Sequence, residues 1–342
     1  MKKKITIRDI AADLGISKTT VSFVLNGKAR ENHISLGLEK TILKHIEKVG
    51  YRPNQFAQSL RTGKTKIIGM MIEDISDPFF SSISRTIEEI AYAQGYKIFY
   101  CSTENDPQRT RDLLKAYRNR QVDGYIIAPP PGIEKELQEL VDDGYPLVLF
   151  DRTLPGLNAD NVVVDNYQGA FNAAHHFIES GYQNIAMITL DSDQIQMMDR
   201  QRGYTDALIG SGRAPLIKMI DYHALKANSI QDIQTFISEN KSLDAVLFAT
   251  NYIAGNGLEA IRNLNLSIPE HLGVIVFDDH DLYRLFTPSV TAISQPVKLI
   301  AEQVINLMLE RLSADTAVER VQSFLLPTHL IVRNSSSPKM AK

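Results

Sequence analysis

The feature that most constrains the fold is a regular alternation of apolar runs with amphipathic segments, which begins after Lys66 and continues to about residue 331. Short apolar runs have the length of buried strands, and apolar residues at helical spacing indicate amphipathic helices. Strands that alternate with helices form parallel sheets with right-handed crossovers. Because the alternation restarts near Val162, the sequence predicts two doubly wound lobes.

The predicted elements fall into two consecutive series. The first contains strands at 67–73, 96–103, 124–128 and 145–151, with helices at 78–94, 107–120 and 133–143. The second contains strands at 184–190, 216–220, 245–250, 273–279 and 323–331, with helices at 167–180, 198–210, 229–239, 252–263 and 296–312.

Polar side chains follow the predicted strands at their carboxyl ends, where ligands bind in doubly wound sheets. A sugar requires such a mixture, because carboxylates and a guanidinium bind its hydroxyl groups while an aromatic face covers its C–H surface. The candidate effector-binding residues of this kind are Asp77, Phe79, Phe80, Asp151, Arg152, Thr250, Asn251 and Asp278. A place in the core is an equal alternative for both phenylalanines, and a helix cap is the alternative for Asn251.

The same region lacks the patterns of an enzyme. The turn after the first strand, residues 73–80, has no glycine fingerprint for a dinucleotide, so no cofactor is predicted. Paired carboxylates also suit glycoside hydrolysis, but no nucleophile elbow or Ser-His-Asp arrangement accompanies them. His175 and His176 are adjacent and therefore point to different sides of a helix, and His280 is predicted to cap a loop rather than contact a ligand. A single cysteine, Cys101, excludes a multi-cysteine metal site and is predicted to be buried and unreactive.

The first 50 residues have the pattern of short helices. Thr6 is a predicted N-cap for a helix that ends at Gly15, and Ser17 is a predicted N-cap for a second helix that ends at Asn26. Two short helices joined through a glycine-containing turn match a helix-turn-helix. A third helix is predicted from Ser35 to about residue 48, with its apolar side chains toward the core: Leu38, Ile42, Leu43, Ile46 and Val49.

The second helix has side chains that the core does not need. They occupy its N-terminal half, the part of a recognition helix that reaches base edges in the major groove. These residues are Lys18, Thr19, Ser22 and Phe23. A lysine can bond to guanine or to a phosphate, and a threonine can contact a thymine methyl group. For Phe23, contact with a thymine methyl group and simple packing both remain open.

Charge is divided unevenly along the chain. Residues 1–66 contain 14 Lys and Arg against 5 Asp and Glu, whereas the remaining 276 residues contain 23 against 35. The net charge of −3 therefore combines a head of +9 with a body of −12. This division is typical of a basic module for a polyanion joined to an acidic body.

Two segments carry a resemblance to a known family. Residues 5–27, ITIRDIAADLGISKTTVSFVLNG, are similar to the reading head of the LacI/GalR family, and residues 51–65, YRPNQFAQSLRTGKT, are similar to its hinge. The resemblance covers essentially the full chain. It implies an all-α helix-turn-helix head and an α/β, two-lobed, periplasmic-binding-protein-like body with two doubly wound parallel sheets.

By position, the resemblance makes Lys18 and Thr19 the major-groove readers and Leu60 an apolar wedge in the minor groove. Such a wedge unstacks one base step and kinks the duplex. Ala57 would allow close approach, and Arg61 would meet the minor groove or a phosphate. The remaining residues that it assigns to DNA are Thr6, Ser17, Ser22, Phe23, Asn26, Ser35, Tyr51 and Asn54. The loop 28–33 is longer than in the lactose repressor, so phosphate contacts there are not transferred.

The resemblance also assigns effector contacts in the body. Arg200 matches an arginine that grips the effector, and Asp151, Asp278 and Gln295 match positions in or beside the cleft. Arg152 close to Arg200 suggests an acidic sugar. The sequence leaves open which sugar binds, whether it induces or co-represses, and which operator is read.

The expected domains are a DNA-binding head (1–50), a hinge helix and linker (51–66), an effector-binding and dimerisation body (67–334) and a disordered tail (335–342). In the body, lobe one would comprise about 67–162 and 293–322, and lobe two about 163–292 and 323–334. The C-terminal segment has no apolar heptad helix, which favours a homodimer over a tetramer.

These observations predict a sequence-specific transcriptional regulator, most simply a repressor, controlled by a small sugar-type effector. Its partners would be a palindromic double-stranded DNA operator and a second copy of the chain, with no membrane. The absence of a signal peptide and of long apolar segments predicts a soluble protein in the bacterial cytosol, associated with the nucleoid. The alternative is a sugar-binding or sugar-processing protein with a vestigial head.

Overall fold

The chain forms two compact units, Met1–Thr65 and Lys66–Lys342, each with its own hydrophobic core. The structure is a computed structural model, and it describes residues 5–51, 63–222, 228–314 and 320–338. We call the first unit the head and the second the body.

In its described residues the head contains three helices: α1 (Ile7–Leu14), α2 (Lys18–Leu25) and α3 (Leu36–Val49). Thr6 accepts from the backbone N–H of Asp9, whose side chain accepts from the Thr6 backbone, so α1 begins with a capping box. Gly15 ends α1 in the left-handed conformation with φ 65°, which glycine adopts without steric strain. These contacts confirm the predicted helix-turn-helix.

The core of the head is small and is built from the inner faces of α1, α2 and α3 together with Ala29 of the loop that follows α2. Its fully or almost fully buried residues are Ile10, Ala11, Val21, Val24, Ala29 and Ile42. The prediction that Leu43 faces the core is wrong, because this side chain is 46% exposed. Leu38, Ile42 and Ile46 form the inward stripe at four-residue spacing, and Leu43 lies beside it on the helix surface.

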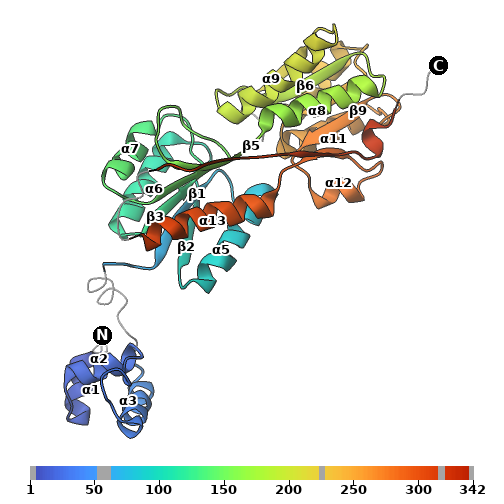
Figure 1. The fold of residues 1–342 in the computed structure, drawn as a ribbon. Helices are drawn as coiled ribbons and strands as arrows, with labels where there is room; N and C mark the ends of the chain where they lie inside the picture. The colour runs from blue at the N-terminus through green and yellow to red at the C-terminus, as the bar shows by residue number, and fades with distance from the viewer. Residues whose placement is uncertain (1–4, 52–62, 223–227, 315–319, 339–342) are drawn as a thin grey trace. The chain divides into compact units, whose positions relative to one another are not determined.

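Lobe one of the body contains a six-stranded sheet in which every pair is parallel. In spatial order its strands are β11 (Ser323–Leu326), β5 (Asp160–Val164), β4 (Leu147–Phe150), β3 (Gly124–Ile127), β1 (Ile67–Ile72) and β2 (Lys97–Ser102). Two helices pack on one face, α5 (Pro78–Ala93) and α13 (Val297–Ser313), and two on the other, α6 (Pro107–Asn119) and α7 (Glu134–Asp142) (Figure 1).

Lobe two repeats this architecture with a second six-stranded sheet. Its strands, in spatial order, are β12 (His329–Ile331), β10 (Thr291–Ser294), β9 (Gly273–Phe277), β8 (Ala245–Phe248), β6 (Ile185–Leu190) and β7 (Leu216–Ile220). One face is covered by α8 (Asn166–Glu179) and α9 (Ile195–Gly210), and the other by α10 (Ser229–Glu239), α11 (Asn251–Asn263) and α12 (Asp281–Leu285). Two doubly wound sheets are therefore confirmed.

The end of the body differs from its prediction. The segment predicted as one strand at 323–331 is two strands, and they belong to different sheets. β11 pairs in parallel with β5 of lobe one, so residues 323–326 do not belong to lobe two, and β12 pairs antiparallel with β10 of lobe two. β10 and α12, which are only four and five residues long, were not predicted from the sequence, and α9 begins three residues before its predicted start.

The predicted disordered tail is wrong at its start, because Ser335 and Ser336 are fully buried in lobe two. They form a short 3-10 helix, η1 (Asn334–Ser336). The Ser335 hydroxyl donates to the Val274 carbonyl at 2.6 Å and accepts from the Thr291 backbone N–H at 2.8 Å. Ser336 lies 2.9 Å from the His176 ring. Polar groups of lobe two therefore hold this segment in place.

Two smaller expectations have different outcomes. His175 and His176 do point to different sides, since His175 stacks on Phe171 while His176 contacts Ser336. Cys101 is only partly buried, because β2 is an edge strand with a single neighbour in its sheet. Among the described residues no helix is both long and apolar enough to cross a membrane.

Candidate functional site

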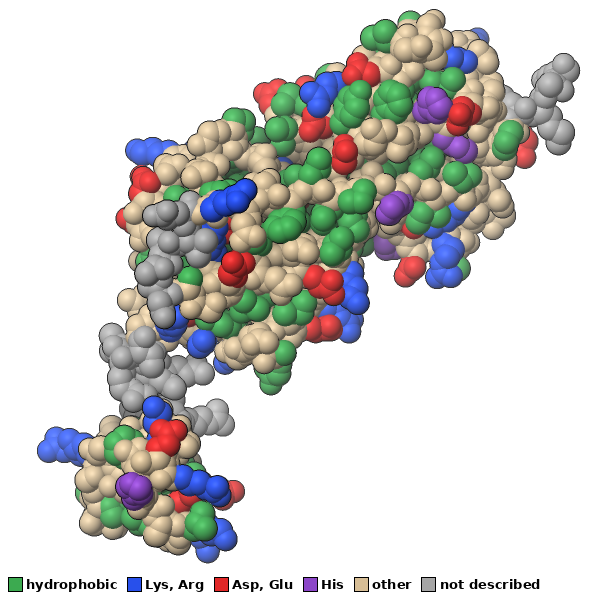
Figure 2. Space-filling model, in the orientation of Figure 1, with side chains coloured by type: hydrophobic (Ala, Val, Ile, Leu, Met, Phe, Trp, Pro, Cys, Tyr) green, Lys and Arg blue, Asp and Glu red, His purple; other side chains and the backbone are tan. Residues whose placement is uncertain are grey.

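The head presents its predicted base readers on the first turn of α2. Lys18 and Thr19 are both exposed, and Ser17 directly before them caps the helix by accepting from the Thr20 backbone N–H at 3.0 Å. The helix is anchored from its opposite side by Val21 and Val24. Lys18 and Thr19 therefore project from a fixed helix end without a role in the core, as base contact requires. Figure 2 shows Lys and Arg side chains projecting from the head on the face in view.

The other predicted DNA residues of the head take more varied places. Ser22 and Phe23 are partly buried on α2, and Phe23 does not belong to the hydrophobic cluster of the head. Asn26 ends α2 and donates to the Ser22 carbonyl at 2.5 Å. Thr6 and Ser35 are exposed N-caps of α1 and α3. Tyr51 packs against the head core, and this burial raises the pKa of its hydroxyl.

Four predicted residues of the hinge, Asn54, Ala57, Leu60 and Arg61, lie outside the described residues. Their roles as cap, close contact, minor-groove wedge and phosphate contact remain predictions.

In the body, all ten predicted effector residues line one small cavity of about 30 Å³. They come from the ends of strands in both sheets and from the helices that follow. Their order in the chain is Asp77, Phe79, Phe80, Asp151, Arg152, Arg200, Thr250, Asn251, Asp278 and Gln295. Residues that are far apart in sequence therefore converge where the two lobes meet.

Arg152 is the most completely paired side chain of this cavity. It donates to Glu73 at 2.7 Å, to Asp151 at 2.8 Å and to Asn105 at 2.9 Å. Burial opposes its charge, but the carboxylates of Asp151 and Glu73 outweigh this effect and raise the pKa of the guanidinium. Arg152 thus holds together the carboxyl ends of β1 and β4.

Arg200, on α9, is the buried arginine that lobe two contributes to the cavity. Its Nε donates to Asn166 at 2.8 Å and its Nη1 to the Ala249 carbonyl at 2.6 Å, while the guanidinium stacks 3.5 Å from the centre of the Phe277 ring. Burial lowers the pKa of Arg200, partly offset by Asp278, whose carboxylate lies 3.9 Å away. The side chain is fixed in advance of any ligand.

Gly203 explains why α9 can bring Arg200 against α8. A Cβ at this glycine would lie 2.1 Å from the Tyr167 carbonyl oxygen, so any larger residue would push the two helices apart. The close crossing lets Arg200 of α9 reach Asn166 at the start of α8.

Two aspartates at equivalent strand ends have left-handed backbones. Asp151 follows Phe150 of β4 with φ 67°, and Asp278 follows Phe277 of β9 with φ 76°. Non-glycine residues with positive φ are uncommon, although aspartate tolerates this region better than most. Such conformations often mark functional sites, where the surrounding structure enforces them. Both carboxylates are thereby turned into the same small cavity.

Asp278 and Asp77 make the cavity electrostatically unfavourable for further negative charge. Gln295 donates to Asp278 at 2.5 Å, yet burial still raises the pKa of Asp278. Asp77 caps α5 by accepting from the Phe79 backbone N–H. Burial, and then repulsion by Asp278, raises the pKa of Asp77 to about 6.

The predictions for the two phenylalanines, for Asn251 and for His280 have different outcomes. Phe79 and Phe80 belong to the core of lobe one and also line the cavity, so the two alternatives coexist. The cap of α11 is Thr250, which accepts from the Ile253 backbone N–H, and the suggestion that Asn251 is the cap is wrong. His280 was predicted to cap a loop rather than contact a ligand; it instead caps the helix α12 by accepting from the Leu282 N–H, and it also lines a large neighbouring cleft.

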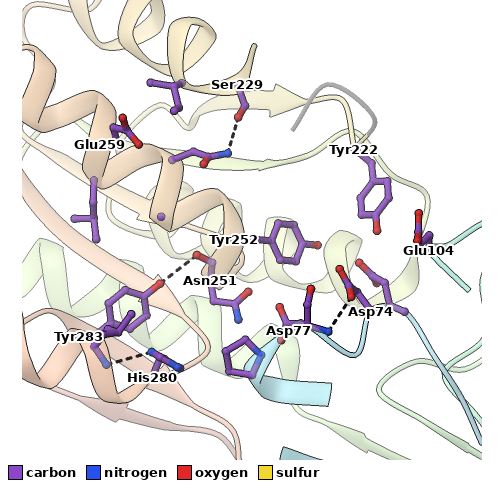
Figure 3. Close-up of a pocket in the computed structure, with 18 of the residues that line it drawn as sticks. Asp74, Asp77, Glu104, Tyr222, Ser229, Asn251, Tyr252, Glu259, His280 and Tyr283 are labelled. Carbon is purple, nitrogen blue, oxygen red and sulfur yellow. Dashed lines mark hydrogen bonds between the residues drawn. The ribbon is translucent and has the colours of Figure 1, made fainter. Parts of the chain in front are cut away.

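A much larger cleft of about 1070 Å³ adjoins the small cavity and shares four lining residues with it, Glu73, Asp77, Asn251 and Tyr252. Lobe one contributes residues between 73 and 78 and between 104 and 109 to its lining, and lobe two contributes Tyr222 and residues at or beside α10, α11 and α12. In Figure 3, Tyr222 and Tyr252 extend toward Asp74 and Asp77 across the cleft.

Most residues of this larger cleft were not predicted from the sequence. The principal omissions are Glu73, Tyr222, Tyr252 and Tyr283. A signal was present in α11, where Tyr252, Asn256 and Glu259 follow a strand end at helical spacing and line the cleft together. Glu73 offered no such signal, because it was included in an apolar strand and its partner Arg152 is 79 residues away.

A helix-turn-helix head with a basic composition, followed by a two-lobed body with an interlobe cleft, defines the class of ligand-responsive DNA-binding regulators. Residues 6–54 match the family model for bacterial regulatory proteins of the lacI family, and residues 174–336 match a periplasmic binding protein-like domain.

The chain is similar over almost its full length to known regulators. It is 31% identical to the sucrose operon repressor of Pediococcus pentosaceus, over 97% of this chain and 98% of that protein. It is also 31% identical to the HTH-type transcriptional regulator KdgR of Bacillus subtilis strain 168, over 98% of this chain and 100% of that protein.

The fold agrees with these similarities. The lac repressor dimer, solved bound to its operator and the anti-inducer ONPF, superimposes with a TM-score of 0.84 at 20% identity, covering 98% of this chain and 100% of that one. The chain belongs to the LacI family of DNA-binding transcriptional regulators.

Proposed function

We propose that this regulator represses transcription by binding a palindromic operator, and that a small sugar-type effector in the interlobe cleft controls its affinity for DNA. The observation that carries the proposal is the convergence of the ten predicted effector residues, from both sheets, on one cavity that opens beside a large cleft. The chemistry of the cavity suits a polyhydroxyl ligand, since carboxylates, amides and aromatic rings surround it. The relation to a sucrose operon repressor supports the same ligand class.

Coupling between the two sites follows from where the cleft residues originate. A ligand that contacts Asp77 in lobe one and Asp278 in lobe two stabilises one arrangement of the lobes over another. The hinge at 51–66 connects lobe one to the head, so a change in lobe arrangement alters how two heads are presented to DNA. By linkage, DNA must change the affinity for effector by the same factor.

The proposed partners are double-stranded DNA, the effector and a second copy of the chain, and the proposed location is the bacterial cytosol at the nucleoid. The lac repressor neighbour forms a dimer on its operator, which supports dimerisation here. The head charge of +9 supports a strongly salt-dependent affinity for DNA. Both close relatives named above are transcriptional regulators, which supports a cleft that binds its ligand without catalysis.

The rival function, sugar binding or processing with a vestigial head, predicts that hinge residues are irrelevant to the activity. Leu60→Ala tests it in the full chain. We expect specific affinity for a palindromic duplex to fall about tenfold or more, because the apolar wedge that kinks the duplex is lost. Effector affinity, measured by calorimetry, should not change. Unaltered DNA affinity would remove the wedge role, and the absence of any sequence-specific DNA binding by the unmodified chain would favour the rival.

A further inference from the structure

The arginines of the small cavity are already neutralised by carboxylates of the chain. Arg152 pairs with Glu73 and Asp151, and Arg200 lies 3.9 Å from Asp278. The side chains of Arg152 and Arg200 are each only 3% exposed. The acidic sugar suggested by the sequence would need these guanidiniums free, so the structure removes the basis for that suggestion.

Negative charge is in excess around both cavities. Among the described residues that line the small cavity or the large cleft, eight carboxylates face four guanidiniums. In the large cleft, Arg109 pairs with Glu104 at 2.9 Å and Arg262 with Glu259 at 3.6 Å. The carboxylates that have no arginine partner among the described residues are Asp74, Asp77 and Asp106, and each accepts from backbone N–H groups near a helix start or turn.

Two buried amides supply a second and independent observation. Gln196 and Gln295 are 3% and 7% exposed, and both line the small cavity. Their nitrogens donate to Gln194 at 3.1 Å and to Asp278 at 2.5 Å, which fixes the orientation of each amide. Their carbonyl oxygens, and that of Asn251, find no donor within the described part of the chain. Buried acceptors without donors are destabilising, so this cavity is suited to a group that donates hydrogen bonds.

The sizes of the two cavities suit a ligand with one small group for the small cavity and a larger part for the cleft. A volume of about 30 Å³ admits one group about the size of a water molecule, such as an ammonium. The adjoining volume of about 1070 Å³ exceeds the space that one sugar ring fills. Tyr222, Tyr252 and Tyr283 line this larger space, and aromatic faces pack against the C–H surfaces of sugar rings.

We propose that the effector is an amino-bearing saccharide of more than one ring, whose ammonium group enters the small cavity between Asp77, Asp278 and Gln295 while its rings occupy the large cleft. An ammonium has three donors and no acceptor, which matches a cavity rich in unpaired acceptors. It also relieves the repulsion between the two aspartates, and its hydrogen bonds to carboxylates are charge-assisted. This inference rests on the proposed function, because it specifies the ligand of the same cleft.

The test compares three disaccharides with the same β-1,4-linked glucose framework, bound to the full chain near neutral pH. They are the fully de-N-acetylated glucosamine dimer, neutral cellobiose and the anionic cellobiouronic acid. By calorimetry we expect the amine to bind about tenfold or more tighter than cellobiose, and the acid to bind more weakly still. Added salt should weaken binding of the amine and leave that of cellobiose nearly unchanged.

A matched pair of variants on one helix locates the ammonium. Asp77→Asn retains a capping side chain for α5, and we expect it to reduce the preference for the amine over cellobiose to about threefold or less. Glu89→Gln removes an exposed carboxylate on the same helix, far along it from the cleft residues, and should leave the preference unchanged.

Three results would overturn the inference. They are cellobiose binding as tightly as the amine, the acid binding more tightly than either, or none of the three binding. The first two results leave a sugar-controlled regulator intact. The third is distinguished from failure of the proposed function by a broader sugar screen that uses release from operator DNA as its readout.

Discussion

The proposed DNA-reading surface and the proposed ligand cleft of this protein hold their candidate residues in opposite ways. Lys18 and Thr19 are exposed on α2, and other residues of that helix form the core. Arg152 and Arg200 are buried in the cleft and paired with neighbouring groups of the body. In the head, therefore, the residues proposed to contact DNA are not the ones that stabilise the fold. In the cleft, the residues proposed to position the ligand also stabilise the fold.

This difference has a physical origin. A head that binds DNA gains affinity when its lysines and arginines neutralise phosphates and release the counterions bound there. The side chains that contact DNA must therefore be exposed to solvent in the free protein. A cleft that discriminates between small ligands needs polar groups fixed in advance, and buried polar groups keep their positions through mutual hydrogen bonds. Substitutions of the exposed readers Lys18 and Thr19 should change binding alone, whereas substitutions of buried, paired cleft residues should change folding as well.

The largest effect is expected for Arg152→Ala. Removal of this guanidinium leaves Glu73 and Asp151 buried without their partner, and breaking a buried ion pair costs about 3–5 kcal/mol. The free energy of unfolding of the body, followed by far-UV circular dichroism in guanidinium chloride, should fall by that amount.

Arg85→Ala is the matched control, because it breaks an ion pair with Glu89 that lies outside the residues lining the cleft and whose side chains are 81% and 66% exposed. Exposed pairs contribute about 0–1 kcal/mol, so the unfolding free energy should hardly change. If both variants lowered the unfolding free energy by the same amount, the claim that the buried cleft residues also stabilise the fold would be contradicted.

A smaller effect, confined to DNA binding, is expected for Lys18→Ala and Thr19→Ala. Each should lower specific operator affinity by about 1–3 kcal/mol, the range for a lost base contact. The midpoint of thermal unfolding should stay the same because both side chains lie outside the core.

The exposed body residue Lys241 offers a control with the same loss of charge. Lys241→Ala should leave DNA affinity unchanged in fluorescence anisotropy titrations. If either head variant shifted the midpoint of thermal unfolding by several degrees, the claim that Lys18 and Thr19 do not stabilise the head would be contradicted.

The smallest effect is expected from the pH dependence of the body. The pKa of Asp77 is raised to about 6 in the folded protein, above its ordinary value of 3.8. The folded state therefore binds more protons than the unfolded state between these values, and this residue's contribution to stability falls as pH rises through that window.

Asp77→Asn retains a capping side chain but removes the buried charge. We expect it to raise the unfolding free energy near pH 7 by about 1 kcal/mol and to flatten the decline between about pH 4 and 6. Denaturant titrations at several pH values measure both changes. A variant whose pH profile matches that of the unmodified chain would show that Asp77 does not titrate in this window.

The sequence predicted the head and the two lobes because their signals are local. Helix caps such as Thr6 and Ser17 sit within three residues of the groups that they satisfy, and apolar periodicity reports burial directly. Eight of the ten cleft residues could be proposed because strand ends carry ligand contacts in doubly wound sheets, whereas Arg200 and Gln295 were proposed from the resemblance to the LacI/GalR family.

The features that the sequence did not predict depend on contacts between segments that are distant in the chain. Ser335 is ordered by Val274 and Thr291, which no local pattern around Ser335 indicates. The separation of β11 from β12 depends on which sheet edge each strand reaches, and a run of apolar residues does not encode that choice. Glu73 pairs with Arg152, which is 79 residues away in the sequence, and no local pattern indicates that contact.

The central claim is that the cleft and the DNA-reading surface are coupled. Its most direct test is a titration of the palindromic operator duplex with the full chain, carried out with the cleft empty and with it saturated by effector. A coupling of about 1–3 kcal/mol, typical of allosteric regulators, predicts a change in operator affinity of about 5- to 150-fold, with an equal and reciprocal change in effector affinity. The same operator affinity in both titrations would contradict the account.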